Sequence, residues 1–284
     1  MDYTYMSLGA GVQSSTLAEM IAERELPPPD LVIFADTGDE PAHTYQQVDY
    51  LRQRLGGVGV ELVTVSAGNL RQALQSGVGR FAAIPAFTVK DGKRGRLQRQ
   101  CTADYKIAPI EAVVRARLLE MGLAKRRKGD GAILIKRGVQ AEAWLGISLD
   151  EVQRMKPNRT RWINNRWPLI EKRMTRHDCR QWLLTRNLPM PQKSSCLICP
   201  FHDDRAWRHL RNNAPDDWAG VVDFDASLRD ERAGRFSSTA TGQLFLHSSC
   251  VPLDEVDLRT PQERGQLSLF ETETDVCDEG YCFI

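Results

Sequence analysis

Two cysteines about two thirds of the way along the sequence have a spacing that suits metal chemistry. Cys196 and Cys199 are separated by two residues, which lets two thiolates bind one metal centre, and Pro200 restricts the backbone beside them. The sequence has seven cysteines, an odd number in a chain too long to need disulfide bonds for its stability. We therefore expect the clustered cysteines to serve metal binding or redox chemistry in a reducing compartment.

A second group of residues suits the binding of phosphate. Gly9 and Gly11 follow an apolar segment and precede Ser14 and Ser15. Glycine lets backbone N–H groups approach phosphate oxygens without a Cβ in the way, and the start of a helix adds positive potential. Glycines also occur at such turns merely for close packing, and the loop alone leaves both interpretations open. Asp36-Thr37-Gly38 follows the next apolar run, and its position favours the binding interpretation.

The elements that must position these residues are indicated by hydrophobic periodicity. Strands are predicted near residues 3–8, 31–35, 61–65, 133–135 and 144–147, and helices from about 14, around 45–55, and near 107–121 and 176–186. This alternation predicts an α/β fold with a mostly parallel, doubly wound sheet. Thr175 and Asp178 predict a capping box at the start of the last helix, whose buried face then includes Cys179.

Two domains are expected from the distribution of residue types. Residues 1–233 would form the nucleotide-binding domain with the cysteine cluster, and residues 234–284 a partly flexible C-terminal extension. The extension begins with a segment rich in Ser, Thr and Gly and ends in an acidic tail that contains Cys277 and Cys282.

Composition excludes some classes of protein. The chain of 284 residues is 42% hydrophobic and 26% charged, as is usual for a soluble globular protein. Neither a stretch long enough to cross a membrane nor a signal pattern is evident, so we expect a cytoplasmic protein without membrane partners. The net charge of +1 gives no broad field for nucleic acid, although basic runs occur at 90–99, 125–128 and 154–166. Most such runs are simply solvent-exposed surface.

Several segments resemble, in matching order, the motifs of one enzyme family. Ser7-Leu8-Gly9-Ala10-Gly11-Val12-Gln13-Ser14 is similar to its Ser-Gly-Gly-x-Asp-Ser loop, and Asp36-Thr37-Gly38 to its Asp-Thr-Gly. The other matching segments are Arg99-Gln100-Cys101-Thr102 with Lys106 and Pro109, Trp144-Leu145-Gly146-Ile147-Ser148 with Asp150 and Arg154, Trp167-Pro168-Leu169, Asn187-Leu188-Pro189 and Cys196-Leu197-Ile198-Cys199-Pro200. Over about residues 1–209 the sequence resembles the phosphoadenosine phosphosulfate (PAPS) reductase family of the adenine nucleotide α-hydrolase-like (PP-loop) superfamily.

The resemblance implies a site for ATP or another adenine nucleotide. Its residues would be Ser7, Gly9, Gly11, Gln13, Ser14, Ser15, Asp36, Thr37, Gly38 and Gly146. Lys106, Arg99 and Arg154 would neutralise the phosphates. Gln13 stands where the family loop has Asp, so the handling of magnesium or of the phosphates is expected to differ. Ser148-Leu149 replaces an Arg pair, which weakens the inference that the substrate is a sulfated nucleotide.

The resemblance also implies that Cys101 joins Cys196 and Cys199 as ligands of a [4Fe–4S] cluster with one open iron. By spacing alone, the three thiolates with His202 would instead favour a structural zinc site. The leading hypothesis is sulfur transfer to a nucleic-acid or base-like acceptor, such as tRNA or DNA, after ATP adenylates it.

Two other functions are kept open. A sulfonucleotide reductase would act with a thioredoxin-like protein in place of a sulfur donor, and Cys282 or Cys277 would be its nucleophile, although acidic neighbours are expected to dull these thiols. A non-catalytic nucleic-acid-binding module would use the basic segment 154–166 with its tryptophans.

Overall fold

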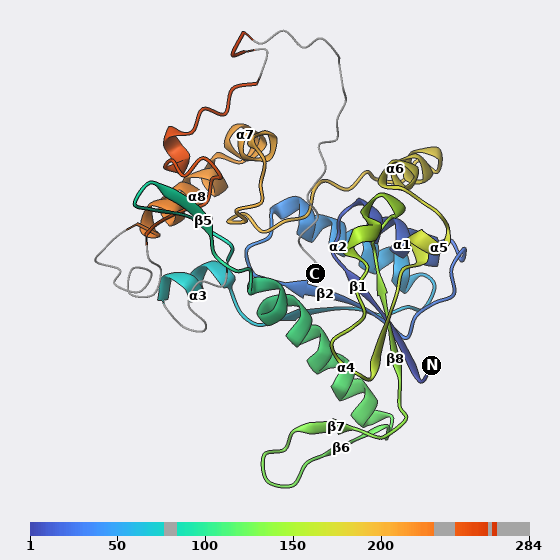
Figure 1. Cartoon of the computed structure of the whole chain (residues 1–284). Helices are drawn as coiled ribbons and strands as arrows, with labels where there is room; N and C mark the ends of the chain where they lie inside the picture. Colours follow the sequence, from blue (N-terminus) through green and yellow to red (C-terminus); the bar gives the residue numbers. More distant parts are fainter. Residues whose placement is uncertain (77–83, 230–241, 261–262, 266–284) are drawn as a thin grey trace. The chain divides into compact units, whose positions relative to one another are not determined.

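The computed structural model describes the chain except for residues 77–83, 230–241, 261–262 and 266–284 (Figure 1). The chain forms two compact units. The sheet unit contains residues 1–67 and 103–195, and the second unit contains residues 68–102 and the described residues from 196 onward. The predicted boundary between residues 233 and 234 lies outside the described residues, so that division stays a prediction. Among the helices described, none is both long and apolar enough to cross a membrane.

The sheet unit is built on five parallel strands. Their order is β3-β2-β1-β8-β9. The strands are β1 (Tyr3–Leu8), β2 (Leu31–Asp36), β3 (Leu62–Ser66), β8 (Ala141–Leu145) and β9 (Ile163–Arg166). In the register of the central strands, Met6 lies between Val32 and Trp144. The predicted α/β fold with a parallel sheet is thus confirmed.

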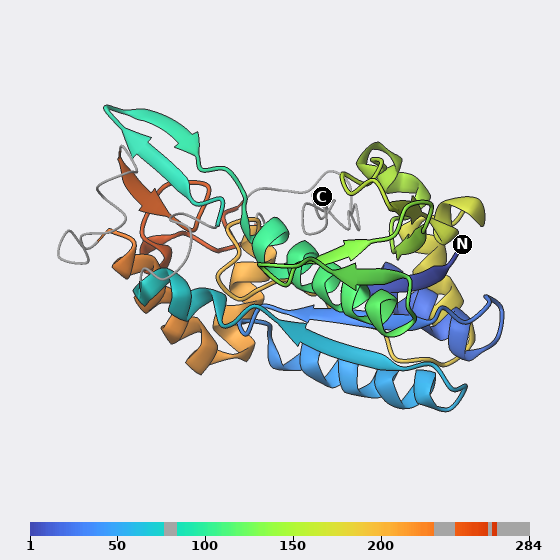
Figure 2. The ribbon, with the colours of Figure 1, turned by 90° about the horizontal axis from the view of Figure 1, so that it is seen from below.

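Helices cover both faces of this sheet (Figure 2). On one face, α1 (Val12–Ala22), α2 (Ala42–Gly56) and α6 (Arg176–Thr185) pack with Met6, Leu8, Val32 and Phe34. On the other face, α4 (Ala108–Glu120) packs with Tyr5, Leu31 and Ile33. Because successive residues of a strand point to opposite faces, burial on both sides explains the continuous apolar run of β2. The short α5 (Pro168–Glu171) follows β9.

One predicted strand has a different place from the others. Residues Ile133–Ile135 form β7, which within the described residues pairs with β6 (Ala124–Arg126) alone, in antiparallel fashion. The two strands form a hairpin that packs on α4 instead of joining the main sheet. Gly129 and Gly131 in its turn both have positive φ, a conformation that favours glycine.

The second unit has its own small sheet. Strands β4 (Phe87–Lys90), β5 (Lys93–Arg96) and β10 (Gln243–Phe245) pair in antiparallel fashion in the order β10-β4-β5. The helices of this unit are α3 (Leu70–Ser76), α7 (Asp204–Asn213), α8 (Pro215–Ser227) and η4 (Leu253–Glu255). Trp207 and Phe224 are its largest fully buried side chains.

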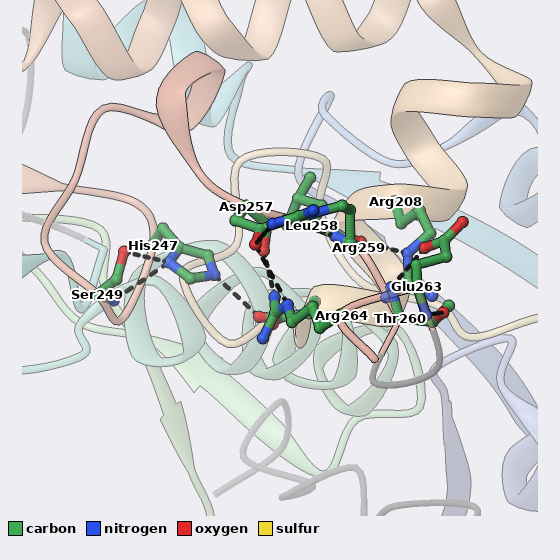
Figure 3. A network of polar contacts seen from close by, with 10 residues as sticks. Arg208, His247, Ser249, Asp257, Leu258, Arg259, Thr260, Glu263 and Arg264 are labelled. Carbon is green, nitrogen blue, oxygen red and sulfur yellow. Dashed lines mark hydrogen bonds and ion pairs between the residues drawn. The ribbon is translucent and has the colours of Figure 1, made fainter. Parts of the chain in front are cut away.

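A polar network ties the last described segment of the second unit to α7 (Figure 3). His247 is buried, and its Nε2 lies 3.0 Å from Oδ1 of Asp204 at the start of α7. Its Nδ1 accepts the backbone N–H of Ser249 at 3.1 Å and lies 2.7 Å from the hydroxyl of the same residue. Further along, Asp257 accepts hydrogen bonds from Arg259, which hold the pKa of this carboxyl well below its usual range. Both ring nitrogens of His247 thus serve to fix the chain.

Candidate nucleotide-binding site

Three polar loops lie at one edge of the main sheet. They follow the carboxyl ends of β2, β1 and β8, which are neighbouring parallel strands. The loops begin at Thr37, Gly9 and Gly146. The carboxyl edge of an open parallel sheet is where ligands of α/β proteins bind. The structure therefore brings together three segments that were singled out in the sequence.

The loop after β1 is short and is held by a serine. Helix α1 begins at Val12, two residues earlier than the sequence suggested. The Ser14 hydroxyl accepts the N–H of Gly9 at 3.2 Å and donates to the carbonyl of Gly11 at 3.3 Å. Ala10 adopts a left-handed conformation with φ of 58°. Ser14 thus fixes the path of the loop, a role that its position in the motif alone did not reveal.

The first turn of α1 offers backbone donors. Gly11 is the N-cap, and no side chain in the described part of the chain caps the helix there. The N–H of Ser15 is bonded to the carbonyl of Gly11 at 2.9 Å, so the N–H groups before it belong to the four that every helix leaves unbonded. These groups and the helix dipole form a local positive potential suited to phosphate.

Gly146 is required where β8 ends. A Cβ added at this residue would lie 2.9 Å from both the N and the Cα of Ser14. Contacts that short do not occur between real Cβ atoms and backbone, so any other residue would force α1 and β8 apart. The sequence motif pointed to Gly146 as a nucleotide contact, and the structure gives it a packing role at the start of α1.

Two other predicted residues of this motif have protein partners. Gln13 donates from Nε2 to the hydroxyl of the buried Ser148 at 3.4 Å. Ser15 is fully buried, and its hydroxyl accepts from Gln47 of α2 at 3.3 Å. Ser15 therefore helps to pack α1 on α2, whereas Ser7 is buried near the end of β1. That these side chains contact a ligand stays a prediction.

Asp36 is oriented by two donors. Its Oδ1 accepts the N–H of Gly38 at 2.7 Å and the phenol of Tyr45 at 2.9 Å. Burial, together with this bond to a carboxylate, raises the pKa of Tyr45, so the phenol stays protonated as a donor. Sequence reasoning missed Tyr45, which was noted only as a residue of the helix that follows.

Glu40 connects Lys106 to the loop that follows β2. Glu40 accepts the hydroxyl of Thr37 at 3.2 Å and forms an ion pair with Lys106 at 3.6 Å. All three side chains are buried. Lys106 is part of η1 (Thr102–Ile107), a π-helical turn before α4, and such turns are frequent at functional sites. Sequence reasoning also missed Glu40, which precedes the predicted helix.

Arg154 is held within its own element. It ends the 3-10 helix η2 (Leu149–Arg154), and its Nη1 lies 2.6 Å from Oε2 of Glu151. Burial raises the pKa of Glu151, while Arg154 opposes that rise. The proposed role of Arg154 toward phosphate stays a prediction. The same holds for Arg99, which belongs to the second unit.

A segment far away in the sequence lies over the glycine loop. The Ser194 hydroxyl donates to the carbonyl of Gly9 and lies 3.2 Å from the place where a Cβ at Gly11 would be. The carbonyl of Lys193 lies 3.1 Å from Nε2 of His43 on α2. No sequence pattern identified Ser194, although it lies two residues before Cys196.

The three cysteines proposed as ligands all belong to the second unit. Cys101, Cys196 and Cys199 are half-buried and form no disulfide. The N–H of Cys199 donates to the carbonyl of Cys196 at 3.0 Å, so the pair forms a turn. Nε2 of His202 lies 3.0 Å from that same carbonyl and is thus used locally.

In the structure, these three thiols are not arranged as a metal site. Within the described residues there is no group of three or more His, Cys, Asp or Glu side chains that could hold a metal ion. The tail cysteines Cys277 and Cys282 lie outside the described residues. The cluster, the zinc alternative and the tail nucleophile therefore stay predictions.

By its fold and the position of its loops, the sheet unit is a doubly wound α/β domain with polar loops at the carboxyl edge of its sheet. No family model matches the sequence, and no curated protein matches it.

Two solved structures are similar to this chain. One is a PAPS reductase from Candida auris in a phosphate complex, with a TM-score of 0.40, 13% identity, and coverage of 67% of this chain and 76% of the other. The second is the U34-tRNA thiolase NcsA from Methanococcus maripaludis with its [4Fe-4S] cluster, with a TM-score of 0.39, 12% identity, and coverage of 88% and 78%.

Proposed function

We propose that this chain is an adenine-nucleotide-dependent enzyme that activates an acceptor with ATP for sulfur transfer. The observation that carries the nucleotide part is the meeting of three polar loops at the carboxyl edge of the sheet, one of which starts a helix without a side-chain cap. Phosphates would contact the N–H groups at the start of α1, in the loop that the Ser14 hydroxyl holds in place. Lys106 of η1, paired with Glu40 of the loop after β2, would add positive charge.

The proposed reaction has two balanced steps. An acceptor oxygen attacks the α-phosphorus of ATP, the bond to the β-phosphate breaks, and pyrophosphate leaves with both electrons of that bond. Hydrosulfide then attacks the activated carbon, the carbon–oxygen bond breaks, and AMP leaves with that oxygen. Donors fixed at the sheet edge would stabilise the negative charge that develops on the phosphates in the first step.

Gln13 and Asp36 give this site a particular chemistry. Gln13 is neutral and donates to Ser148, so it adds no negative charge beside the phosphates. Asp36 is held by Gly38 and Tyr45, and its remaining oxygen would accept a hydroxyl of the nucleotide. Magnesium would then be held mainly by the phosphates, as is usual for this ion.

Metal binding by the cysteines is a separate part of the proposal. Because the described side chains do not form a ligand group, no step of the reaction is assigned to a cluster. Anaerobic purification with metal analysis tests it, comparing the native chain with Cys196→Ala. Iron with labile sulfide that is lost in the variant would support a [4Fe–4S] cluster, whereas one equivalent of zinc would support the structural alternative.

The nucleotide site is tested with Gly11→Asp. Asp is a favoured N-cap, so its carboxylate should satisfy the first turn of α1 while it repels phosphate. The new Cβ lies 3.2 Å from the Ser194 hydroxyl, which must shift slightly, so we expect a small change in thermal stability. ATP affinity in calorimetry should fall at least about tenfold, which is about 1.4 kcal/mol. Gly56→Asp is the matched control, because a Cβ added there would meet nothing within 4 Å. Equal ATP affinities of the native chain and Gly11→Asp would refute the proposal that ATP binds at this site.

The reaction itself is tested by its products. Release of pyrophosphate and AMP in the presence of acceptor and sulfide supports adenylation. An enzyme that instead releases sulfite from adenylylsulfate with thioredoxin, and cleaves no ATP, would be a reductase. Replacing Cys277 and Cys282 by Ser should then abolish that activity.

A further inference from the structure

The hairpin of β6 and β7 is a strongly basic, exposed element of the sheet unit that the proposed nucleotide site does not use. Residues 123–140, called the basic hairpin below, contain six basic side chains and one acidic side chain. The acid, Asp130, already pairs with Arg127 across the turn. The basic side chains that remain are Lys125, Arg126, Lys128, Lys136 and Arg137, and all are exposed.

Packing leaves one face of this hairpin to solvent. Ile133 and Ile135 pack against the core beneath α4, so their side of the hairpin is covered. Leu134 points to the other side and is exposed, and Lys125 is its partner across the strands. Residues opposite each other in an antiparallel pair share a face. Lys125 therefore stands on the outer face of the hairpin. Figure 1 shows the hairpin itself, next to the end of α4.

A second basic segment continues this surface. Arg115 of α4 donates to the carbonyl of Ile133 in the hairpin at 3.4 Å, and its guanidinium lies 4.8 Å from the ring centroid of Trp162. Arg159 and Arg161, just before Trp162, are exposed. The carbonyl of Trp162 accepts the N–H of Ala141, the residue that follows the hairpin, at 2.8 Å. The two basic segments are thus tied side by side.

We propose that the basic hairpin, with Arg159 and Arg161, binds the phosphodiester backbone of a nucleic acid. Several exposed cations on a fixed hairpin suit a partner with regularly spaced negative charges, and such contacts supply most sequence-independent affinity for nucleic acid. An acidic protein would offer isolated carboxylates, for which single exposed ion pairs give little affinity. Nearby Glu111 does not cancel the surface, because it already bonds Arg115 and Thr160.

The position of this surface indicates that it anchors the partner and takes no part in the reaction. The hairpin leads into the amino end of β8, whereas Gly146 follows its carboxyl end. Five residues of strand separate them, which is about 16 Å. One helical turn of duplex is about 34 Å long, so a nucleic acid held at the hairpin can extend past both edges of the sheet. The inference deepens the proposed function by naming the acceptor class, but binding does not depend on ATP.

The test measures binding to labelled duplex DNA and folded RNA without nucleotide, by fluorescence anisotropy between about 50 and 200 mM salt. The variant Lys125→Glu/Lys128→Glu/Lys136→Glu should bind at least about tenfold more weakly, with a slope of log K against log salt shallower by about 2 to 3, since each phosphate contact contributes about 0.9. Lys→Gln at the same positions is the milder version, should charge reversal disturb folding.

A matched control carries three exposed basic residues of the same unit, in Arg24→Glu/Lys172→Glu/Arg173→Glu, and should bind as the native chain does. The relative affinities for DNA and RNA show which of the two nucleic acids is the preferred partner. Equal loss in both triple variants, no binding by the native chain, or equally tight binding to polyglutamate would each overturn the proposal. ATP affinity, measured on the same variants, should not change, so failure here is distinct from failure of the nucleotide site.

Discussion

At the scale of single residues, burial decides the chemistry of Cys179. This thiol is fully buried in α6, and burial raises its pKa to about 12 from an ordinary value of 9.0. Because the thiolate is the reactive form, we expect no alkylation of Cys179 by iodoacetamide at pH 8 in the native chain. Mass spectrometry should find it modified only after urea unfolding, and rapid native modification would contradict the burial.

The same shift predicts a pH dependence of stability. Between pH 9 and about 12, the unfolded state loses the thiol proton while the folded state keeps it. Stability contributed by the buried thiol is therefore complete below pH 9 and falls as the pH rises toward 12. The difference in unfolding free energy between the native chain and Cys179→Ala should shrink over this range, as measured by urea denaturation. A constant difference would count against the shift.

Gly146 gives a second prediction at this scale. Gly146→Ala would place a methyl group 2.9 Å from the backbone of Ser14, and relief requires a shift of α1 or β8. Overpacking of this kind costs about 1–3 kcal/mol, which urea unfolding should detect. Gly56→Ala, where the new Cβ meets nothing, should not lower stability, because Ala is favoured over Gly in a helix. Equal stability of the two variants would show that the close approach does not exist.

The residue types of the candidate site were predictable, but most of their partners were not. The glycines and Asp36 were found because their types and their place after apolar runs carry a physical meaning. Ser194 lies 185 residues from the carbonyl it bonds, and only the folded chain brings the two together. Glu40 and Tyr45 act by contact with predicted residues, a property that no local pattern encodes.

At the scale of elements, the capping box of α6 was predicted and is confirmed. The Thr175 hydroxyl accepts the N–H of Asp178 at 3.1 Å, and the Asp178 carboxylate accepts the N–H of Thr175 at 2.8 Å. Thr175→Ala should cost about 1 kcal/mol in urea denaturation, as is usual for loss of a cap. Thr185→Ala at the other end of the helix is the control, and an equal cost there would contradict the special role of the cap.

Elements of the second unit escaped prediction for a physical reason. Strands β4 and β5 are four residues each, and β5 consists of Lys93-Arg94-Gly95-Arg96, with all four residues exposed. No apolar alternation marks such a strand, which exists because it pairs with β4. The apolar and helical elements of the sheet unit can be predicted from local sequence patterns, whereas β5 depends on its pairing with β4.

At the scale of the molecule, the parallel sheet follows from the alternation of strands and helices, but the division into units does not. The sheet unit is assembled from two separate stretches of chain, 1–67 and 103–195. Composition changes along a sequence mark linkers, and they carry no information on a unit that the chain leaves and re-enters. The predicted division at residue 233 was based on such a change.

The proposed nucleotide site lies at one edge of the sheet. ATP binding should therefore change hydrogen exchange in one part of the chain and leave the rest unchanged. A ligand that binds the native state stabilises it by RT ln(1 + [L]/Kd), about 2.7 kcal/mol at a hundredfold excess over Kd. Hydrogen exchange should slow at the loops after β1, β2 and β8 and in the first turn of α1, while the β6–β7 hairpin at the other end of β8 keeps its rate. Gly11→Asp should lose this protection and Gly56→Asp should retain it. Protection centred on the hairpin, with the three loops unchanged, would place the nucleotide at the wrong edge of the sheet and refute the proposed site.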